Sequence, residues 1–220
     1  MNDILSLAAS HGGKASQPID LLAALTFLAI IPFVLVMTTS FVRIVVVLSL
    51  IRQALGTPSL PPNTVLTGIA LVLTFVVMSP TVSTISHDAI GPYLSGKLDQ
   101  RGVVDRGERP LREFMLRQTR RSDLEMFARL HHQDASAIDR LPFEVITPAF
   151  AVGELRAAFS IGFALYLPFL AIDLAVASIL MGLGMMMLSP TVVSLPCKIL
   201  LFVMVDGWAV VLGGVASSFR

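Results

Sequence analysis

Four long apolar segments constrain this chain more than any other feature of its sequence. They run from Leu21 to Ile51, from Thr64 to Ser79, from Phe159 to Leu180 and from Lys198 to Val215. A helix needs ~20 apolar residues to cross a bilayer, and a soluble domain carries about 25% charged residues. This chain of 220 residues carries only 14%. The sequence therefore predicts an all-α membrane protein built from two long helical hairpins.

Prolines fall within or at the ends of these segments. A proline removes a backbone donor and clashes with the preceding turn, so it ends or kinks a helix. Interrupted backbone at membrane depth is tolerated only where other protein or a cavity covers it. We therefore expect kinked hairpins in an obligate oligomer. The prolines concerned are Pro32, Pro80, Pro168 and Pro196.

A charged block separates the two hairpins. Ten basic and ten acidic residues lie between Asp88 and Glu144. Within it, Arg109–Thr119 has an amphipathic pattern, Ser122–Glu125 matches a helix capping box, and residues 91–107 suggest a loop. The sequence thus predicts a flexible leader at 1–19, a first hairpin at 20–86, an inserted, mainly helical domain at 87–145, and a second hairpin at 146–220.

The charges near the hairpin tips predict the orientation. Short cytoplasmic loops are enriched in Lys and Arg, and the tips carry Arg43 and Arg52 in one hairpin and Lys198 in the other. Both tips are then expected on the cytoplasmic side, and the termini and the inserted domain on the other, extracytoplasmic side. Residues 1–19 lack the basic region and apolar core of a signal peptide.

Four charged residues occupy apolar surroundings, where each costs at least ~2.5–3.5 kcal/mol at a bilayer centre. We expect them to pair within or between subunits, although a long side chain can instead extend to the interface. Pairing is favoured for the aspartates because their side chains are too short to extend far. The four are Arg43, Asp173, Lys198 and Asp206.

The sequence does not favour an enzyme. It contains no His-Glu-x-x-His zinc motif and no phosphate-cradling loop. A dyad of Asp173 and Asp206 would share one proton in an aspartyl protease, but no glycine-rich turn precedes either residue. Cys197 is the only cysteine, so no internal disulfide forms, and we expect a small buried thiol. No cofactor, metal or nucleic acid is expected.

A methionine triplet joins the last two apolar segments: Met185, Met186 and Met187. Methionine is unbranched and flexible, so it fills irregular gaps and repacks easily. The triplet suits either a tight apolar turn or a soft closure around a pore. Glycines and prolines around it are the expected hinges of this loop: Gly182, Gly184, Pro190 and Pro196.

Glu154 and Arg156 lie where the charged block rejoins the membrane hairpin. One interpretation is a charge pair that links neighbouring subunits. The other is a solvated helix start, in which the helix dipole favours the glutamate.

Nine motifs, in order, resemble the FliP/SctR family of type III export-gate proteins over residues 20 to 219. The residues of these motifs resemble the flagellar branch of the family more than the injectisome branch. Cys197 replaces the phenylalanine that is usual at its position. The motifs are Thr39–Arg43, Arg52–Pro58, Pro61–Asn63, Met78–Pro80, Pro110–Arg120, Pro168–Leu174, Gly184–Met187, Leu195–Lys198 and Val205–Trp208.

The resemblance implies a core channel subunit of the flagellar protein export gate. In that family several copies, usually five, form a helical ring with FliQ and FliR in the bacterial inner membrane at the flagellar basal body. Much of the assembly lies on the periplasmic side. FlhA and FlhB act with it, unfolded flagellar subunits pass through it, and the methionine triplet is its pore gasket. The equivalent injectisome subunit and an ion-coupled transporter are the alternatives, although the hairpins show no inverted repeat.

Overall fold

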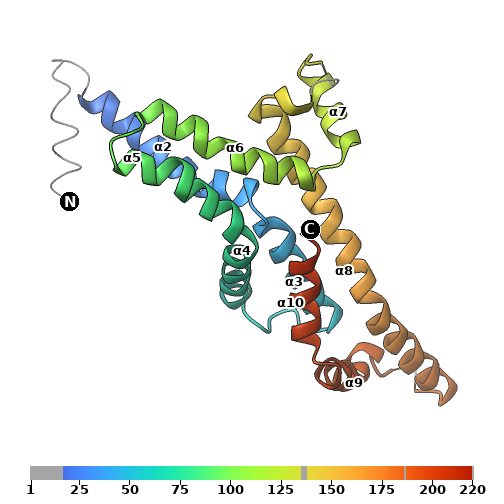
Figure 1. Cartoon of the computed structure of the whole chain (residues 1–220). Coiled ribbons are helices and arrows are strands. Elements are labelled where there is room, and N and C mark those ends of the chain that lie inside the picture. Colours follow the sequence, from blue (N-terminus) through green and yellow to red (C-terminus); the bar gives the residue numbers. More distant parts are fainter. Residues whose placement is uncertain (1–16, 135–137, 186, 220) are drawn as a thin grey trace. The chain divides into compact units, whose positions relative to one another are not determined.

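The computed structural model is all-helical over the residues it describes, which are 17–134, 138–185 and 187–219 (Figure 1). No strand occurs in those ranges. The chain divides into two compact units, one ending at Val36 and one beginning at Met37. Each is described by itself below. The predicted all-α fold class is confirmed.

The first unit contains most of one helix, α2, which spans Gln17–Thr38 and includes Pro32. Its side chains Leu21, Leu25 and Phe33 are apolar and more than half exposed. Residues 1–16 of the predicted leader lie outside the described residues, and residues 17–19 are helical.

The second unit is organised around α8, a helix of 40 residues from Phe143 to Gly182. At 1.5 Å per residue it is about 60 Å long, roughly twice the ~30 Å hydrocarbon core of a bilayer. Part of α8 must therefore extend beyond any membrane that it crosses. The other apolar helices of this unit are α3 (Phe41–Ala54), α4 (Asn63–Ile85), α9 (Pro190–Met204) and α10 (Gly207–Ser217).

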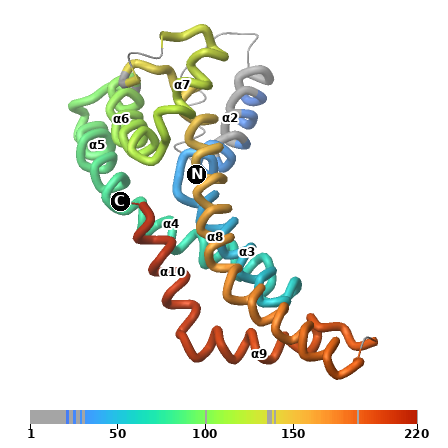
Figure 2. The backbone as a smooth tube through the Cα atoms, turned by 90° about the vertical axis from the view of Figure 1, so that its right-hand side faces the viewer, coloured from blue at the N-terminus to red at the C-terminus, as the bar shows by residue number. Residues whose placement is uncertain are grey.

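The helix α3 packs along α8, and the two lie side by side in both views (Figures 1 and 2). Ile44, Leu48 and Ile51 are buried there. Gly162 of α8 permits the close approach, because a Cβ at this position would lie 2.3 Å from Cδ1 of Leu50. This contact forms the centre of the first hydrophobic core.

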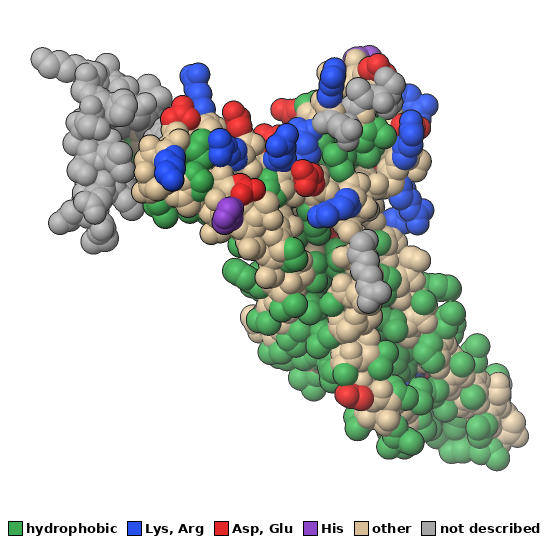
Figure 3. Space-filling view, in the orientation of Figure 1, with side chains coloured by type: hydrophobic (Ala, Val, Ile, Leu, Met, Phe, Trp, Pro, Cys, Tyr) green, Lys and Arg blue, Asp and Glu red, His purple; other side chains and the backbone are tan. Residues whose placement is uncertain are grey.

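The charged block folds into short helices around a second core. It contains a π-helical turn, η1, at Ser86–Ile90, then α5 at Gly91–Leu94, α6 at Gln100–Gln118, α7 at Arg121–Leu130 and a 3₁₀ turn, η2, at Ile138–Arg140. The core side chains come from α6, α7 and the start of α8, and include Phe114, Met115, Leu124 and Phe150. Charged side chains gather over α6 and α7, whereas hydrophobic ones cover the part built from α3, α4, α8 and α10 (Figure 3).

The structure corrects two expectations for this block. Residues 91–107 are not a loop, because α6 begins at Gln100 and the Asp99 carboxylate caps it by accepting from the Gly102 N–H at 2.9 Å. Ser122 is not a cap, because α7 has already begun at Arg121. The amphipathic pattern of Arg109–Thr119 is confirmed, since Phe114 and Met115 are buried.

Among the residues that the structure describes, two helical stretches are long and apolar enough to cross a membrane, namely Asn63–Leu94 and Phe143–Gly182. Neither Pro80 nor Pro168 ends its helix. Two broken helix pairs raise the number to four if each counts as one span, and one of them, Pro190–Met204 with Gly207–Ser217, bends by 65°. The apolar helices fit a membrane protein.

Candidate functional site

The methionine loop, defined here as Leu183–Ser189, joins α8 to α9. Gly184 has a left-handed backbone with φ of +72°, a conformation that glycine adopts without steric cost. Its N–H donates to the Met181 carbonyl at 3.0 Å, and the Met185 N–H donates to the Leu180 carbonyl at 2.9 Å. This pair of hydrogen bonds is the Schellman closure of a helix C-terminus. The loop therefore leaves α8 by a defined turn.

The methionine loop forms the tip of the α8–α9 hairpin (Figure 2). Met187 is fully exposed, and Met185, Leu183 and Leu188 are 44% to 68% exposed. Met186 lies outside the described residues. Of the predicted hinges, Gly182 is the last residue of α8, Pro190 is the first of α9, and Pro196 lies inside α9.

An ion pair joins the two arms of this hairpin. Lys198 of α9 donates to the Asp173 carboxylate of α8 at 2.6 Å. The Ser194 hydroxyl donates to the other oxygen of the same carboxylate. The Lys198 ammonium also donates to the Ala54 carbonyl at 3.2 Å, at the end of α3. The structure thus brings together two of the four predicted buried charges and ties them to a third helix.

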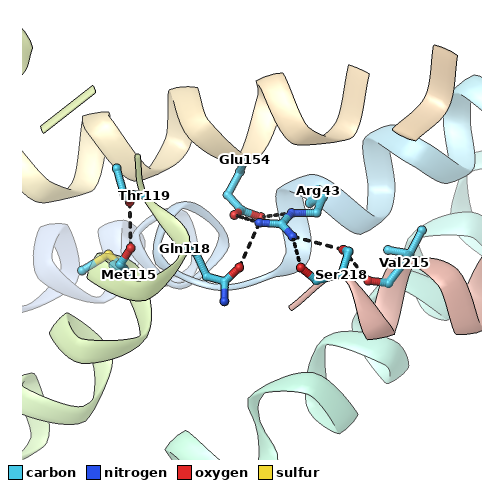
Figure 4. A network of polar contacts seen from close by, with 7 residues as sticks. All are labelled: Arg43, Met115, Gln118, Thr119, Glu154, Val215 and Ser218. Carbon is cyan, nitrogen blue, oxygen red and sulfur yellow. Dashed lines mark hydrogen bonds and ion pairs between the residues drawn. The ribbon is translucent and has the colours of Figure 1, made fainter. Parts of the chain in front are cut away.

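Arg43 forms the centre of a second polar network (Figure 4). Its guanidinium makes a bidentate ion pair with the Glu154 carboxylate, and the Nε donates at 2.9 Å. It also donates to the Ser218 carbonyl at 3.0 Å and to the Gln118 side chain at 3.3 Å. The Phe219 ring lies 3.8 Å from the guanidinium carbon. One buried cation therefore connects α3, α6, α8 and the segment after α10.

Glu154 is the Arg43 partner that sequence reasoning missed. A signal was present, because Glu154 is the only acidic residue between Glu144 and Asp173. Its side chain is fully enclosed by its own chain, so its partner is intramolecular. Arg156 instead contacts Asp123 of α7 at 2.7 Å.

Asp206 and Cys197 differ from their expected surroundings. Asp206 is exposed, has a left-handed backbone with φ of 50°, and makes no ion pair among the described residues. It occupies the break between α9 and α10, so solvent or a partner reaches it. Cys197 lies on α9 and is exposed rather than buried in the single chain.

These features define a class: a protein that is all-helical over its described residues, with membrane-type apolar hairpins in which Arg43 and Lys198 are paired with carboxylates of the same chain. No cluster of metal-ligating side chains occurs in the described part of the chain. The sequence model of the FliP family matches residues 24–215, so the chain belongs to the FliP family.

Similar proteins from several bacteria carry the same family name. The flagellar biosynthetic protein FliP of Pectobacterium carotovorum is 48% identical over 211 residues, which are 95% of this chain and 82% of that protein. That of Bacillus subtilis is 43% identical over the full length of both chains. That of Buchnera aphidicola (Baizongia pistaciae) is 46% identical, but this chain spans only 61% of its length. The chain is therefore a flagellar biosynthetic protein of the export apparatus.

Proposed function

We propose that this chain is the core channel subunit of the flagellar type III export gate. Several copies assemble with FliQ and FliR around a pore in the bacterial inner membrane, at the basal body. Unfolded flagellar subunits cross through this pore, and FlhA and FlhB act beside it. The observation that carries the proposal is the exposed apolar tip at Met185 and Met187.

The chemistry of the tip supports a seal. An exposed apolar tip is unfavourable in water, so it gains stability when it meets other apolar groups. Copies arranged in a ring bring their tips together on the axis. Methionine side chains repack around cargo of variable shape, which a stiffer β-branched side chain does not permit.

The rest of the apolar surface supports assembly. Leu174, Ile179, Leu200 and Met204 lie on the α8–α9 hairpin and are more than half exposed. Large exposed apolar patches mark contacts with protein or lipid. A single chain leaves them uncovered, whereas a ring with partner subunits in a membrane covers them.

The direct test deletes the native gene in a flagellated bacterium, or replaces it with a gene for the tagged chain. We expect deletion to abolish secretion of filament subunits, and expect the tagged chain to purify with FliQ and FliR as one complex of defined mass. A detergent-solubilised monomer that ignores both partners contradicts the proposal. An ion-coupled transporter would leave filaments intact after deletion.

The seal is tested by the double substitution Met185→Ala and Met187→Ala. The complex should assemble, but its ion conductance in planar bilayers should rise above that of the parent complex because smaller side chains leave gaps. The matched control is Met126→Ala, since Met126 is 41% exposed on α7 in the charged block. Equal conductance of the double variant and the parent refutes the seal.

A further inference from the structure

The α8–α9 hairpin has almost no buried side chain beyond the Asp173–Lys198 ion pair. Between Leu174 and Val193, Leu180 is the only buried residue among those described. Asp173 lies nine residues before the end of α8, and Lys198 lies eight residues after the start of α9. At 1.5 Å per residue, both arms extend about 12–14 Å past the pair. The ion pair is therefore the last firm attachment before the methionine loop.

The Lys198 ammonium is placed to hold three helices at once. It contacts Asp173 of α8 and the Ala54 carbonyl of α3, while it belongs to α9 itself. A carbonyl at a helix C-terminus has no partner within its helix and carries the negative end of the dipole. It is thus a natural second acceptor for an ammonium group. Ser194 donates to the remaining Asp173 oxygen and fixes that carboxylate in turn.

We propose that Lys198 is a positioning residue for the methionine loop. Its ammonium joins α9 to Asp173 of α8 and to the end of α3, and so sets how far and in which direction the hairpin tip projects. Loss of this attachment lets the two arms move apart or tilt against α3. The role of the attachment in sealing rests on the proposed export function, whereas its effect on loop position does not.

The test measures loop position directly. Spin labels are placed at Met187→Cys on the loop and at Gln53→Cys, an exposed position in the last turn of α3. The exposed Cys197 is first replaced by serine. Labelled chains are mixed with an excess of unlabelled chains in the purified complex, so that electron–electron distances report one subunit. The parent should give a narrow distance distribution.

Lys198→Met keeps the length of the side chain but removes its charge and donors. We expect a broader and displaced distance distribution for Lys198→Met. The distribution for Lys198→Arg should stay nearly as narrow as that of the parent, because arginine keeps the positive charge. Lys97→Met is the control, since Lys97 is an exposed lysine between α5 and α6. A Lys198→Met distribution as narrow as that of the parent overturns the proposal.

Milder variants cover the case in which Lys198→Met does not assemble. Ser194→Ala removes one hydrogen bond to Asp173, and Asp173→Asn removes the charge of the pair. The distance distribution should broaden slightly in Ser194→Ala and more in Asp173→Asn. If neither variant broadens it, the proposal is overturned. Ion conductance is recorded on the same complexes. Loop displacement without leakage refutes the seal at the loop, but leaves the positioning role intact.

Discussion

The two halves of the second unit have opposite arrangements of charge. In the charged half, built from α6, α7 and the start of α8, ion pairs such as Arg121–Glu125 lie on the surface around a small apolar core. In the apolar half, built from α3, α9, α10 and the rest of α8, the Arg43–Glu154 and Lys198–Asp173 pairs lie inside. The face of this half seen in Figure 3 is mostly apolar.

This difference shows that one helix serves two environments. The start of α8 places Ile146 and Phe150 in the core of the charged half, as in a soluble domain. Farther along, Phe163 and Leu174 face outward. Charge on the surface suits water, whereas apolar surface with charge inside suits lipid or neighbouring protein. The boundary between the two arrangements lies close to Glu154.

The largest effect is expected from breaking the buried pair at this boundary. Arg43→Met leaves the Glu154 carboxylate buried without its cation, so the free energy of unfolding should fall by about 3–5 kcal/mol. Thermal or denaturant unfolding of the detergent-solubilised protein measures this change. The double variant Arg43→Met with Glu154→Leu should recover most of the loss, since no unpaired charge remains. A single variant as stable as the parent would mean that the pair contributes nothing.

The next effect compares one leucine from each half. Leu124→Ala removes a buried side chain from the core of the charged half, and we expect it to lower the free energy of unfolding by about 2–5 kcal/mol. Leu174→Ala alters a side chain that is 62% exposed in the apolar half. Its stability in detergent should change by less than about 0.5 kcal/mol. Co-purification with FliQ and FliR should weaken for Leu174→Ala but not for Leu124→Ala. Equal effects of the two substitutions on the free energy of unfolding and on co-purification would contradict the difference between the halves.

The smallest effect is expected at the surface pair of the charged half. Arg121 and Glu125 are spaced four residues apart on α7, and the Arg121 side chain is 71% exposed. Exposed pairs contribute about 0–1 kcal/mol, so Arg121→Met should shift the unfolding midpoint only slightly. High salt should remove the difference, because it screens exposed charges. If Arg121→Met lowered the free energy of unfolding as much as Arg43→Met, the exposure of an ion pair would not determine how much it contributes to stability.

Local patterns in the sequence predicted the elements well where one signal dominated. The amphipathic helix over Arg109–Thr119 is such a case, because its apolar stripe depends only on side chains within a few residues of one another. The failures came from competing local signals. Residues 91–107 contain four glycines, which suggested a loop, yet the Asp99 cap and the packing of α6 produce a helix.

The pairing of charges required the folded chain. From the sequence, Arg43, Asp173, Lys198 and Asp206 were expected to neutralise one another, and the structure joins only Asp173 to Lys198. Arg43 pairs with Glu154, which lies 111 positions away in the sequence, because α3 packs against α8 and places the two side chains next to each other. Sequence separation carries no information on such a crossing, so the choice among possible partners stayed open.

The sequence by itself determined that this chain is helical, that its apolar segments are of membrane type, and that a methionine-rich loop joins the last two of them. Those properties depend on composition and on spacing over one or two helical turns. Only the tertiary structure decided which charges lie inside and what each one holds. Burial and ion pairing depend on how helices far apart in the sequence pack, and the close contact at Gly162 sets that packing.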